Sequence, residues 1–144
     1  MTRAARIVLS ARGWTGTPYR HQASLKGVGC DCLGLVRGVW REVMGDEPEP
    51  VPPYAPGWAE NTGVEALADA ARRNLQERPC MDIRGGDLLL FRWRTHLPAK
   101  HAGIATSQTQ MIHAQDNACV AEIELSGWWR RHLAFVFRFP GVDA

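Results

Sequence analysis

Residues 31–43 read Asp-Cys-Leu-Gly-Leu-Val-Arg-Gly-Val-Trp-Arg-Glu-Val, and they form the clearest periodic element of this 144-residue chain. Apolar residues recur there at the spacing of one face of a helix. They are Cys32, Leu35, Val36, Val39, Trp40 and Val43. Asp31 is a favourable N-cap, and Gly45 is a favourable residue just beyond the C-terminal end. The pattern therefore predicts a buried helix that begins at Cys32.

The position of Cys32 at the start of this helix has two interpretations. Unpaired backbone N–H groups and the positive end of the helix dipole stabilise a thiolate at such a site. A thiolate attacks carbonyl carbons, and the same N–H groups can hold the oxyanion that forms. The alternative is that Cys32 is a small apolar member of the buried stripe. Cys30 lies before the N-cap, outside the helix.

A cysteine nucleophile needs a base, and two of the five histidines have an informative spacing. His101 and His113 are twelve residues apart, with Ser107 midway. If a β-hairpin is centred on Ser107, the two imidazoles lie directly opposite each other on one face. One imidazole could then orient the other, as the third residue does in a catalytic triad. The alternative is two unrelated strand histidines. We expect the other three, His21, His96 and His132, at the surface.

Helix-like patterns precede strand-like patterns along the chain. We expect helices over residues 3–12, 32–43 and 64–75, the third with a capping box formed by Thr62 and Glu65. We expect strands over residues 87–93, 101–106, 110–114, 118–125 and 133–139, with a helical turn over 127–132. Five of the nine prolines lie between Pro48 and Pro56, so an extended loop precedes the third helix. Helices followed by strands predict an α+β fold with an antiparallel sheet, and the length fits one domain over residues 1–144.

Charge and hydropathy exclude several classes of protein. The longest apolar run, residues 133–137, is far too short to span a membrane. Residues 1–13 lack the apolar core of a signal peptide, so we expect synthesis in the cytoplasm and no disulfide framework. A net charge of +2 gives no indication of nucleic-acid binding. Residues 42–71 hold seven acidic residues and no Lys or Arg, so the remaining chain is basic. A basic body favours an anionic substrate or partner, and a solvated surface of mixed charge is the alternative.

Five short motifs follow one another along nearly the whole chain. They are Gly16-Thr17-Pro18-Tyr19, Asp31-Cys32-Leu33-Gly34-Leu35-Val36, Gly86-Asp87-Leu88-Leu89-Leu90-Phe91, His101-Ala102-Gly103-Ile104 and Met111-Ile112-His113-Ala114. In this order they resemble the NlpC-type cell-wall cysteine peptidases, which form a papain-like superfamily. The resemblance implies a papain-like NlpC fold, in which the cysteine helix packs on an antiparallel β-sheet.

The same resemblance implies roles for individual residues. It assigns the nucleophile to Cys32, the base to His101 and the orienting third residue to His113. It places Tyr19 and Asp31 beside them as oxyanion or substrate-binding residues. The implied substrate is the stem peptide of peptidoglycan, usually cleaved at the γ-D-glutamyl–diaminopimelate bond, with no metal or cofactor.

Two features depart from the usual family pattern. Leu33 stands where the family usually has Ser, beside the nucleophile. Residues 45–78, the proline-rich loop and third helix, are longer than a minimal domain needs, so we interpret them as an insertion. Within this insertion, Tyr54 and Trp58 serve either to dock a partner or to hold the loop to the body.

Three features resemble the phage-tail branch of the family. They are the lack of a wall-binding repeat, the run Tyr-Arg-His-Gln after Pro18 and the closing run Phe-Arg-Phe-Pro. That branch includes peptidases of gene-transfer particles. It implies tail-tip or baseplate proteins as partners, and a particle that carries the enzyme to the wall or periplasm of a target cell. Three alternatives remain. They are an N-acetylmuramoyl-L-alanine amidase, a structural tail component with a vestigial site, and a metal site built from Cys30, Cys32 and histidines, for which Cys-x-Cys is poor zinc spacing.

Overall fold

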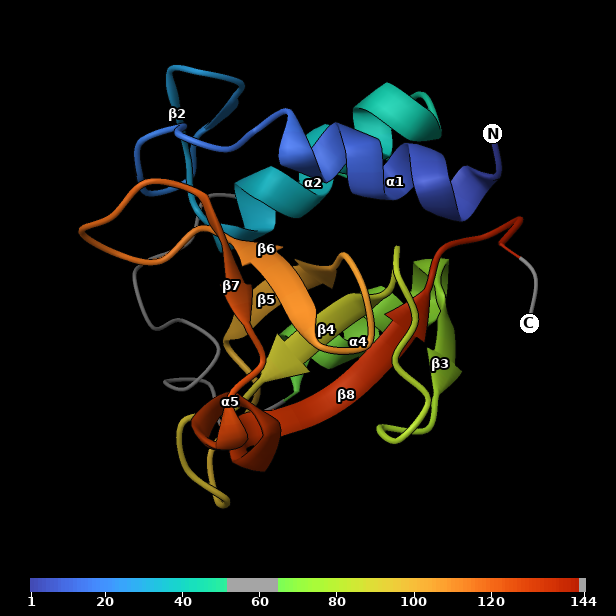
Figure 1. Cartoon of the computed structure of the whole chain (residues 1–144), viewed down its shortest axis with the longest axis vertical. Coiled ribbons are helices and arrows are strands. Elements are labelled where there is room, and N and C mark those ends of the chain that lie inside the picture. Colours follow the sequence, from blue (N-terminus) through green and yellow to red (C-terminus); the bar gives the residue numbers. More distant parts are fainter. Residues whose placement is uncertain (52–64, 143–144) are drawn as a thin grey trace.

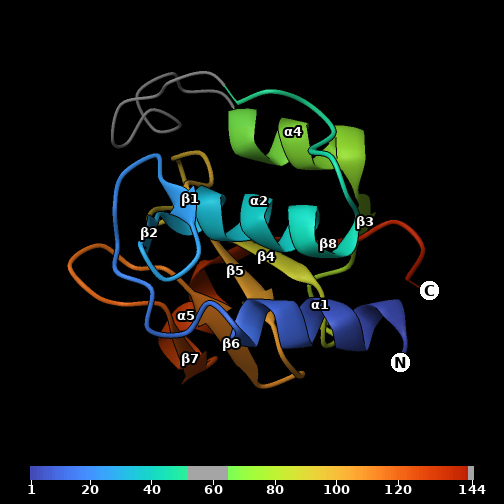
Figure 2. The ribbon, with the colours of Figure 1, turned by 90° about the horizontal axis from the view of Figure 1, so that it is seen from above.

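A computed structural model describes residues 1–51 and 65–142 (Figure 1). Its centre is a six-stranded antiparallel sheet with strand order β3-β8-β4-β5-β6-β7. The strands are β3 (Gln76–Arg78), β4 (Leu88–Phe91), β5 (His101–Ala105), β6 (Gln110–His113), β7 (Ala121–Glu124) and β8 (Leu133–Arg138). Three helices, α1 (Arg3–Arg12), α2 (Cys32–Val43) and α4 (Ala66–Asn74), lie side by side over the sheet in Figure 2. The predicted α+β fold, with the cysteine helix on an antiparallel sheet, is confirmed.

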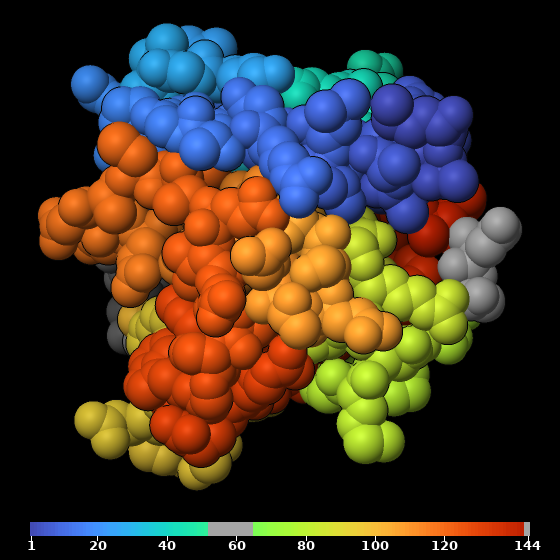
Figure 3. Space-filling model, viewed as in Figure 1, coloured from blue at the N-terminus to red at the C-terminus, as the bar shows by residue number. Residues whose placement is uncertain are grey.

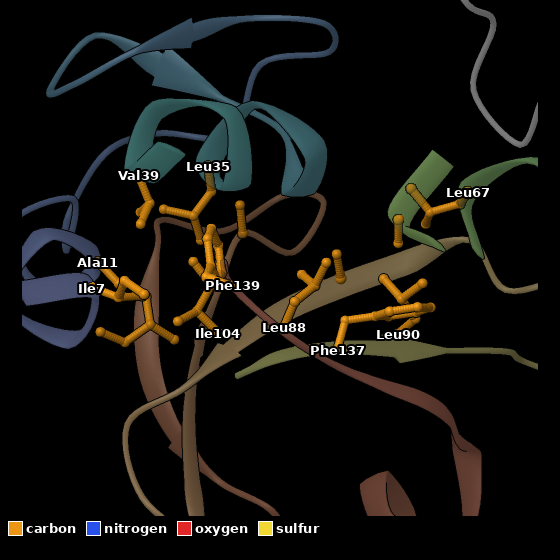
Figure 4. Packing of buried hydrophobic residues seen from close by; sticks show 14 of the residues in the cluster. Ile7, Ala11, Leu35, Val39, Leu67, Leu88, Leu90, Ile104, Phe137 and Phe139 are labelled. Carbon is orange, nitrogen blue, oxygen red and sulfur yellow. The ribbon is translucent and has the colours of Figure 1, made fainter. Parts of the chain in front are cut away.

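The core has two layers because strand side chains alternate between the two faces of the sheet. On the helix side, apolar residues of α1, α2 and α4 pack on those of the strands (Figure 4). They include Ile7, Leu35, Val39, Leu67, Leu88, Leu90, Ile104 and Phe137. The opposite face is covered by the short helix α5 (Gly127–His132) and neighbouring loops. There Leu89, Phe91, Met111 and Val136 pack with Ile83, Leu125 and the half-buried Trp129.

Side chains cap the N-terminal ends of α1 and α2. The hydroxyl of Thr2 accepts a hydrogen bond from the backbone N–H of Ala5 at 3.1 Å, at the start of α1. Asp31 caps α2 by accepting from the N–H of Gly34 at 2.7 Å. Helix α2 ends at Val43 with Met44 as its C-cap, and Gly45 turns the chain away with a φ of +100°, a conformation that favours glycine.

The elements differ from expectation mainly at their ends and in two short hairpin strands. The long strands are each one to four residues shorter than predicted, and α4 begins at Ala66. Thr62 of the predicted capping box lies outside the described residues, and Glu65 is itself the N-cap residue of α4, without a side-chain cap hydrogen bond. The carboxylate of Glu65 instead accepts from the N–H of Ala99 at 2.9 Å. Strand β3 and the hairpin β1 (Ser24–Leu25) and β2 (Gly29–Cys30) were not predicted, since none is longer than three residues.

A buried ion pair links the turn before β4 to the end of β8. Arg138 donates two hydrogen bonds of 2.9 Å to the carboxylate of Asp87, and each residue is 1% exposed. Asp87 also accepts from the N–H of Arg84 at 2.9 Å. Two of the motifs noted in the sequence, Gly-Asp-Leu and Phe-Arg-Phe, therefore meet in one structural contact.

Most of the acidic residues that the structure describes in the acidic segment form ion pairs within the molecule. Glu47 pairs with Arg37 at 2.7 Å and with Arg41 at 3.1 Å, and Glu49 pairs with Arg73 at 2.8 Å. These contacts tie the proline-rich segment to α2 and α4. Much of the charge asymmetry in the sequence is therefore used for intramolecular pairing.

Candidate active site

The first turn of α2 meets the start of β5, and this contact places the thiol of Cys32. The thiol donates a long hydrogen bond of 3.9 Å to the carbonyl oxygen of Lys100. The backbone N–H of Ala102 also lies close enough to act on the sulfur as a donor. The sulfur therefore lies against the main chain on both sides of His101.

Asp31 fixes the start of α2 through both carboxylate oxygens. Oδ1 accepts from the N–H of Gly34, and Oδ2 accepts from the N–H of Gln22 at 2.8 Å. A Cβ at position 34 would overlap the carbonyl oxygen of Ala23, so only glycine fits there. Asp31 is 3% exposed. Its observed contacts are those of a positioning residue, and its role towards substrate stays a prediction.

The imidazoles of His101 and His113 are in direct contact, with Nε2 of His101 2.8 Å from Nδ1 of His113. The expected register was wrong. Gly103, not His101, pairs with His113, so the hairpin is centred on residue 108 rather than on Ser107. The partner changes by two residues, which preserves the face on which each side chain lies. Since Gly103 has no side chain, the imidazole of His101 can reach His113 diagonally.

A group of aromatic rings encloses the histidine pair. Trp93 stacks on His101 with ring centroids 5.5 Å apart, and Trp129 lies 5.6 Å from the His101 ring. Trp129 also meets His113 edge to face at 5.1 Å. His101 is 6% exposed and His113 is 4% exposed. This group was not predicted from the sequence, although the two adjacent tryptophans in the predicted turn over 127–132 were a usable signal.

Burial keeps the thiol and both imidazoles neutral at neutral pH. It lowers the pKa of His101 to about 3, with further contributions from His113 and Lys100, and it lowers the pKa of His113 to about 4. Burial, and then the charge of Asp31, raise the pKa of the Cys32 thiol to about 11. The N–H groups of α2 act in the opposite direction but do not compensate for burial. Burial and the helix terminus therefore act in opposite directions on the protonation of this thiol.

Tyr19 lies near Cys32 and keeps its proton. Burial, Cys32 and Asp31 together raise its pKa to about 12. Its main chain is held by a hydrogen bond of 3.1 Å from its N–H to the carbonyl of Ala118. The phenol is half-buried and remains an O–H donor near the sulfur.

The other candidate residues lie apart from this cluster. All four cysteines are free, and burial raises the pKa of Cys30 in β2 to about 12. Among the described residues, no group of three or more His, Cys, Asp and Glu side chains could hold a metal ion. His21 approaches Asp31 at 3.9 Å, and His96 is exposed as expected. His132 is half-buried and stacks on Trp128 at 4.0 Å, contrary to the expectation of a simple surface residue.

Leu33, the departure from the usual motif, lines a cavity of about 290 Å³ between α2 and α4. Val36, Leu67 and Val51 also line this cavity. Tyr54 and Trp58, the aromatic residues singled out in the sequence, lie outside the described residues. No helix in the described part of the chain has the length and hydropathy needed to cross a bilayer.

Comparison with known proteins connects this geometry to one family. The sequence model described as the NlpC/P60 family matches residues 16–138. A comparison with curated protein sequences gives no match.

Three solved structures illustrate the likeness of fold. One is a protein of the NLP/P60 family from Staphylococcus aureus, described as similar to lipoprotein. It has 21% sequence identity and a TM-score of 0.65, and the alignment covers 99% of this chain and 42% of that chain. The second is the NlpC/p60 domain of the peptidoglycan hydrolase SagA, with 23% identity and a TM-score of 0.68 over 94% of this chain and 98% of that one. The third is RipD from Mycobacterium tuberculosis, described as a non-catalytic NlpC/p60 domain protein adapted to peptidoglycan binding. It has 14% identity and a TM-score of 0.59 over 96% of this chain and 98% of that one.

Proposed function

The chain belongs to the NlpC/P60 family, and we propose that it is a cysteine peptidase that hydrolyses the stem peptide of peptidoglycan at the γ-D-glutamyl–diaminopimelate bond. The observation that carries the proposal is the position of the Cys32 thiol against the main chain on both sides of His101. His101 is in turn held by His113 at 2.8 Å. The proposal therefore assigns the nucleophile to Cys32, the base to His101 and the orienting group to His113, which is the set of roles that thiol catalysis needs.

In the proposed first step, the sulfur of Cys32 attacks the amide carbonyl carbon while its proton passes to Nδ1 of His101. This nitrogen is available because Nε2 of His101 is used in the contact with His113. In this arrangement Nε2 of His101 carries a proton and donates a hydrogen bond to Nδ1 of His113. The proton of the neutral His113 ring therefore lies on the Nε2 of His113. The contact fixes the His101 tautomer and stabilises the imidazolium that forms.

The tetrahedral intermediate collapses when the carbon–nitrogen bond breaks and the His101 imidazolium protonates the departing amine. Water then attacks the thioester, with His101 as the base, and releases the acid product and the free thiol. Because both partners rest in the neutral form, proton transfer accompanies the attack rather than preceding it.

The proposed donors for the oxyanion are two backbone N–H groups of α2 and the phenol of Tyr19. The backbone N–H groups of Cys32 and Leu33 act on the thiol from the first turn of α2. The next N–H in the helix, that of Gly34, is already used by Asp31. The phenol of Tyr19 is a third donor that stays protonated. Such fixed donors stabilise negative charge where it develops in the transition state.

Product analysis tests the reaction and separates it from its closest alternative. Purified protein is incubated with intact sacculi, and the released fragments are identified by mass spectrometry. A peptidase yields fragments cut after γ-D-glutamate. An N-acetylmuramoyl-L-alanine amidase instead releases whole stem peptides from the glycan. Binding to sacculi without any released fragment would indicate a vestigial site, comparable to the non-catalytic, peptidoglycan-binding domain of RipD.

We also propose that a phage-like particle carries the enzyme at its tail tip and delivers it to the wall or periplasm of the target cell. The support is the resemblance of the sequence around residues 18–22 and 137–140 to tail peptidases. Part of the second motif has a structural role, because Arg138 pairs with Asp87. Mass spectrometry of purified particles tests this location. Absence of the chain from particles that contain the other tail proteins would contradict it.

A further inference from the structure

A second cavity, of about 460 Å³, lies between the loop that follows β4 and the end of α5. Arg92, Trp93 and Arg94 line it from the loop, and Arg131 and His132 line it from α5. In Figures 1 and 3 the yellow loop after β4 projects next to the orange-red α5. The proposed reaction steps use none of these five side chains.

The arginines that line this cavity differ in whether an acidic group pairs with them. Arg92 donates to the carboxylate of Glu65 at 2.8 Å and to the carbonyl of Leu97 at 2.6 Å, so its charge is paired. Arg94 and Arg131 are exposed, and neither has an acidic partner within residues 1–51 and 65–142. The cavity therefore presents two guanidinium groups that are available to an anion.

His132 adds a further polar group to the same wall. Its Nδ1–H donates to the carbonyl of Trp128 at 2.7 Å, and its ring stacks on the Trp128 indole. These two contacts fix the ring in the wall of the cavity. The lining thus combines fixed aromatic walls with cationic groups, which suits a small anionic group.

One indole separates this cavity from the proposed base. Trp93 stacks on His101 with centroids 5.5 Å apart, and it also meets His132 edge to face at 6.5 Å. In the proposed reaction His101 protonates the departing amine, so the residue that carries this amine lies next to His101. A side chain of that residue can extend past Trp93 towards Arg94 and Arg131.

We propose that Arg94 and Arg131 form a carboxylate-binding subsite for the residue that leaves with the amine product. This inference rests on the proposed function. Diaminopimelate in a stem peptide carries a free carboxylate at the far end of its side chain, whereas lysine at the same position carries none. A guanidinium matches a carboxylate with two parallel hydrogen bonds. The subsite therefore selects diaminopimelate-containing peptides over lysine-containing ones.

The test compares two tetrapeptides that differ only in having diaminopimelate or lysine at the third position. We expect the wild type to prefer the diaminopimelate peptide by about tenfold or more in kcat/KM, the range for a charged hydrogen-bonded contact. The double variant Arg94→Gln/Arg131→Gln should lose this preference through a higher KM, with kcat within about twofold of wild type, because the contact binds ground state and transition state alike. Arg6→Gln, which removes one exposed charge on α1, is the matched control and should keep the preference.

Calorimetry of the binding of both peptides to a Cys32→Ala variant distinguishes a wrong subsite from a wrong proposed function. If the wild type cleaves neither peptide, the proposed function is wrong, and binding still decides the subsite. Tighter binding of the diaminopimelate peptide that disappears when Arg94→Gln and Arg131→Gln are added supports the subsite. A preference that survives both substitutions, or equal binding of the two peptides, overturns it.

Discussion

Replacing Asp87 by Asn removes one charge from the most buried ion pair described and nearly preserves its shape. Arg138 then keeps its positive charge at 1% exposure and faces a neutral amide, and the negative charge nearest to it is the Asp82 carboxylate at 3.8 Å. Breaking a buried pair costs about 3–5 kcal/mol because the remaining charge is uncompensated. Since Asp82 supplies partial compensation, we expect a loss of about 3 kcal/mol.

Urea unfolding measured by circular dichroism tests this value, with Asp82→Asn as the control. Asp82 is partly exposed, so its loss should cost less than about 1 kcal/mol. A double variant, Asp87→Leu with Arg138→Met, should recover most of the stability, because no charge remains buried. If Asp87→Asn is as stable as wild type, the pair does not hold the turn before β4 to β8. If the double variant is less stable than Asp87→Asn, the cost does not come from the unpaired charge.

Three further predictions concern the candidate site. His101→Ala should lower kcat/KM by about 10²–10⁴-fold, and His113→Ala should lower it by less. His113→Asn should restore part of the loss seen in His113→Ala, because the amide oxygen can accept from Nε2–H of His101. A larger loss in His113→Ala than in His101→Ala would reverse the two roles. Alkylation of Cys32 by iodoacetamide in the free enzyme should accelerate with pH up to about 11, the value set by burial; a plateau near neutral pH would instead show a resting thiolate. Tyr19→Phe should lower kcat by about tenfold with little change in KM if the phenol donates to the oxyanion, and an unchanged kcat would remove Tyr19 from that role.

The buried histidines also predict how stability depends on pH. Their pKa values in the folded protein, about 3 and about 4, lie below the ordinary value of 6.5. Unfolding therefore takes up protons below pH 6.5. The stability that depends on neutral His101 and His113 is fully present above pH 6.5 and is lost as the pH falls towards 3. His113→Asn should make the melting temperature less sensitive to pH between 6.5 and 4, whereas an unchanged slope would contradict the assignment.

Helix α2 and the histidine face were predictable because each follows from a local periodicity. The stripe from Cys32 to Val43 and the Asp31 cap needed only the helical repeat. The side-chain contact between His101 and His113 needed only the two-residue repeat of strands, because a register change of two leaves both side chains on the same face. The register itself depends on the turn around residue 108, and the polar residues there are compatible with more than one turn.

Contacts between distant segments left no local pattern to read. The partners Asp87 and Arg138 are 51 residues apart, and neither lies on a charged face that would indicate pairing. Strand β3 has the sequence Gln-Glu-Arg, which lacks apolar alternation and gains its place only by pairing with β8. The pKa of Cys32 was also not predictable, because the helix terminus favours the thiolate while burial opposes it, and only the three-dimensional packing decides between them.

Hydrolysis of a stem tetrapeptide by Cys32→Ser and Cys30→Ser variants tests the central claim most directly. Both residues lie near the start of α2, but only Cys32 is placed against the main chain on both sides of His101. We expect Cys32→Ser to lose essentially all hydrolysis and to keep the wild-type circular dichroism spectrum, whereas Cys30→Ser keeps most of the activity. Equal activity of the two folded variants, or full hydrolysis by Cys32→Ser, would contradict the assignment of Cys32 as the nucleophile.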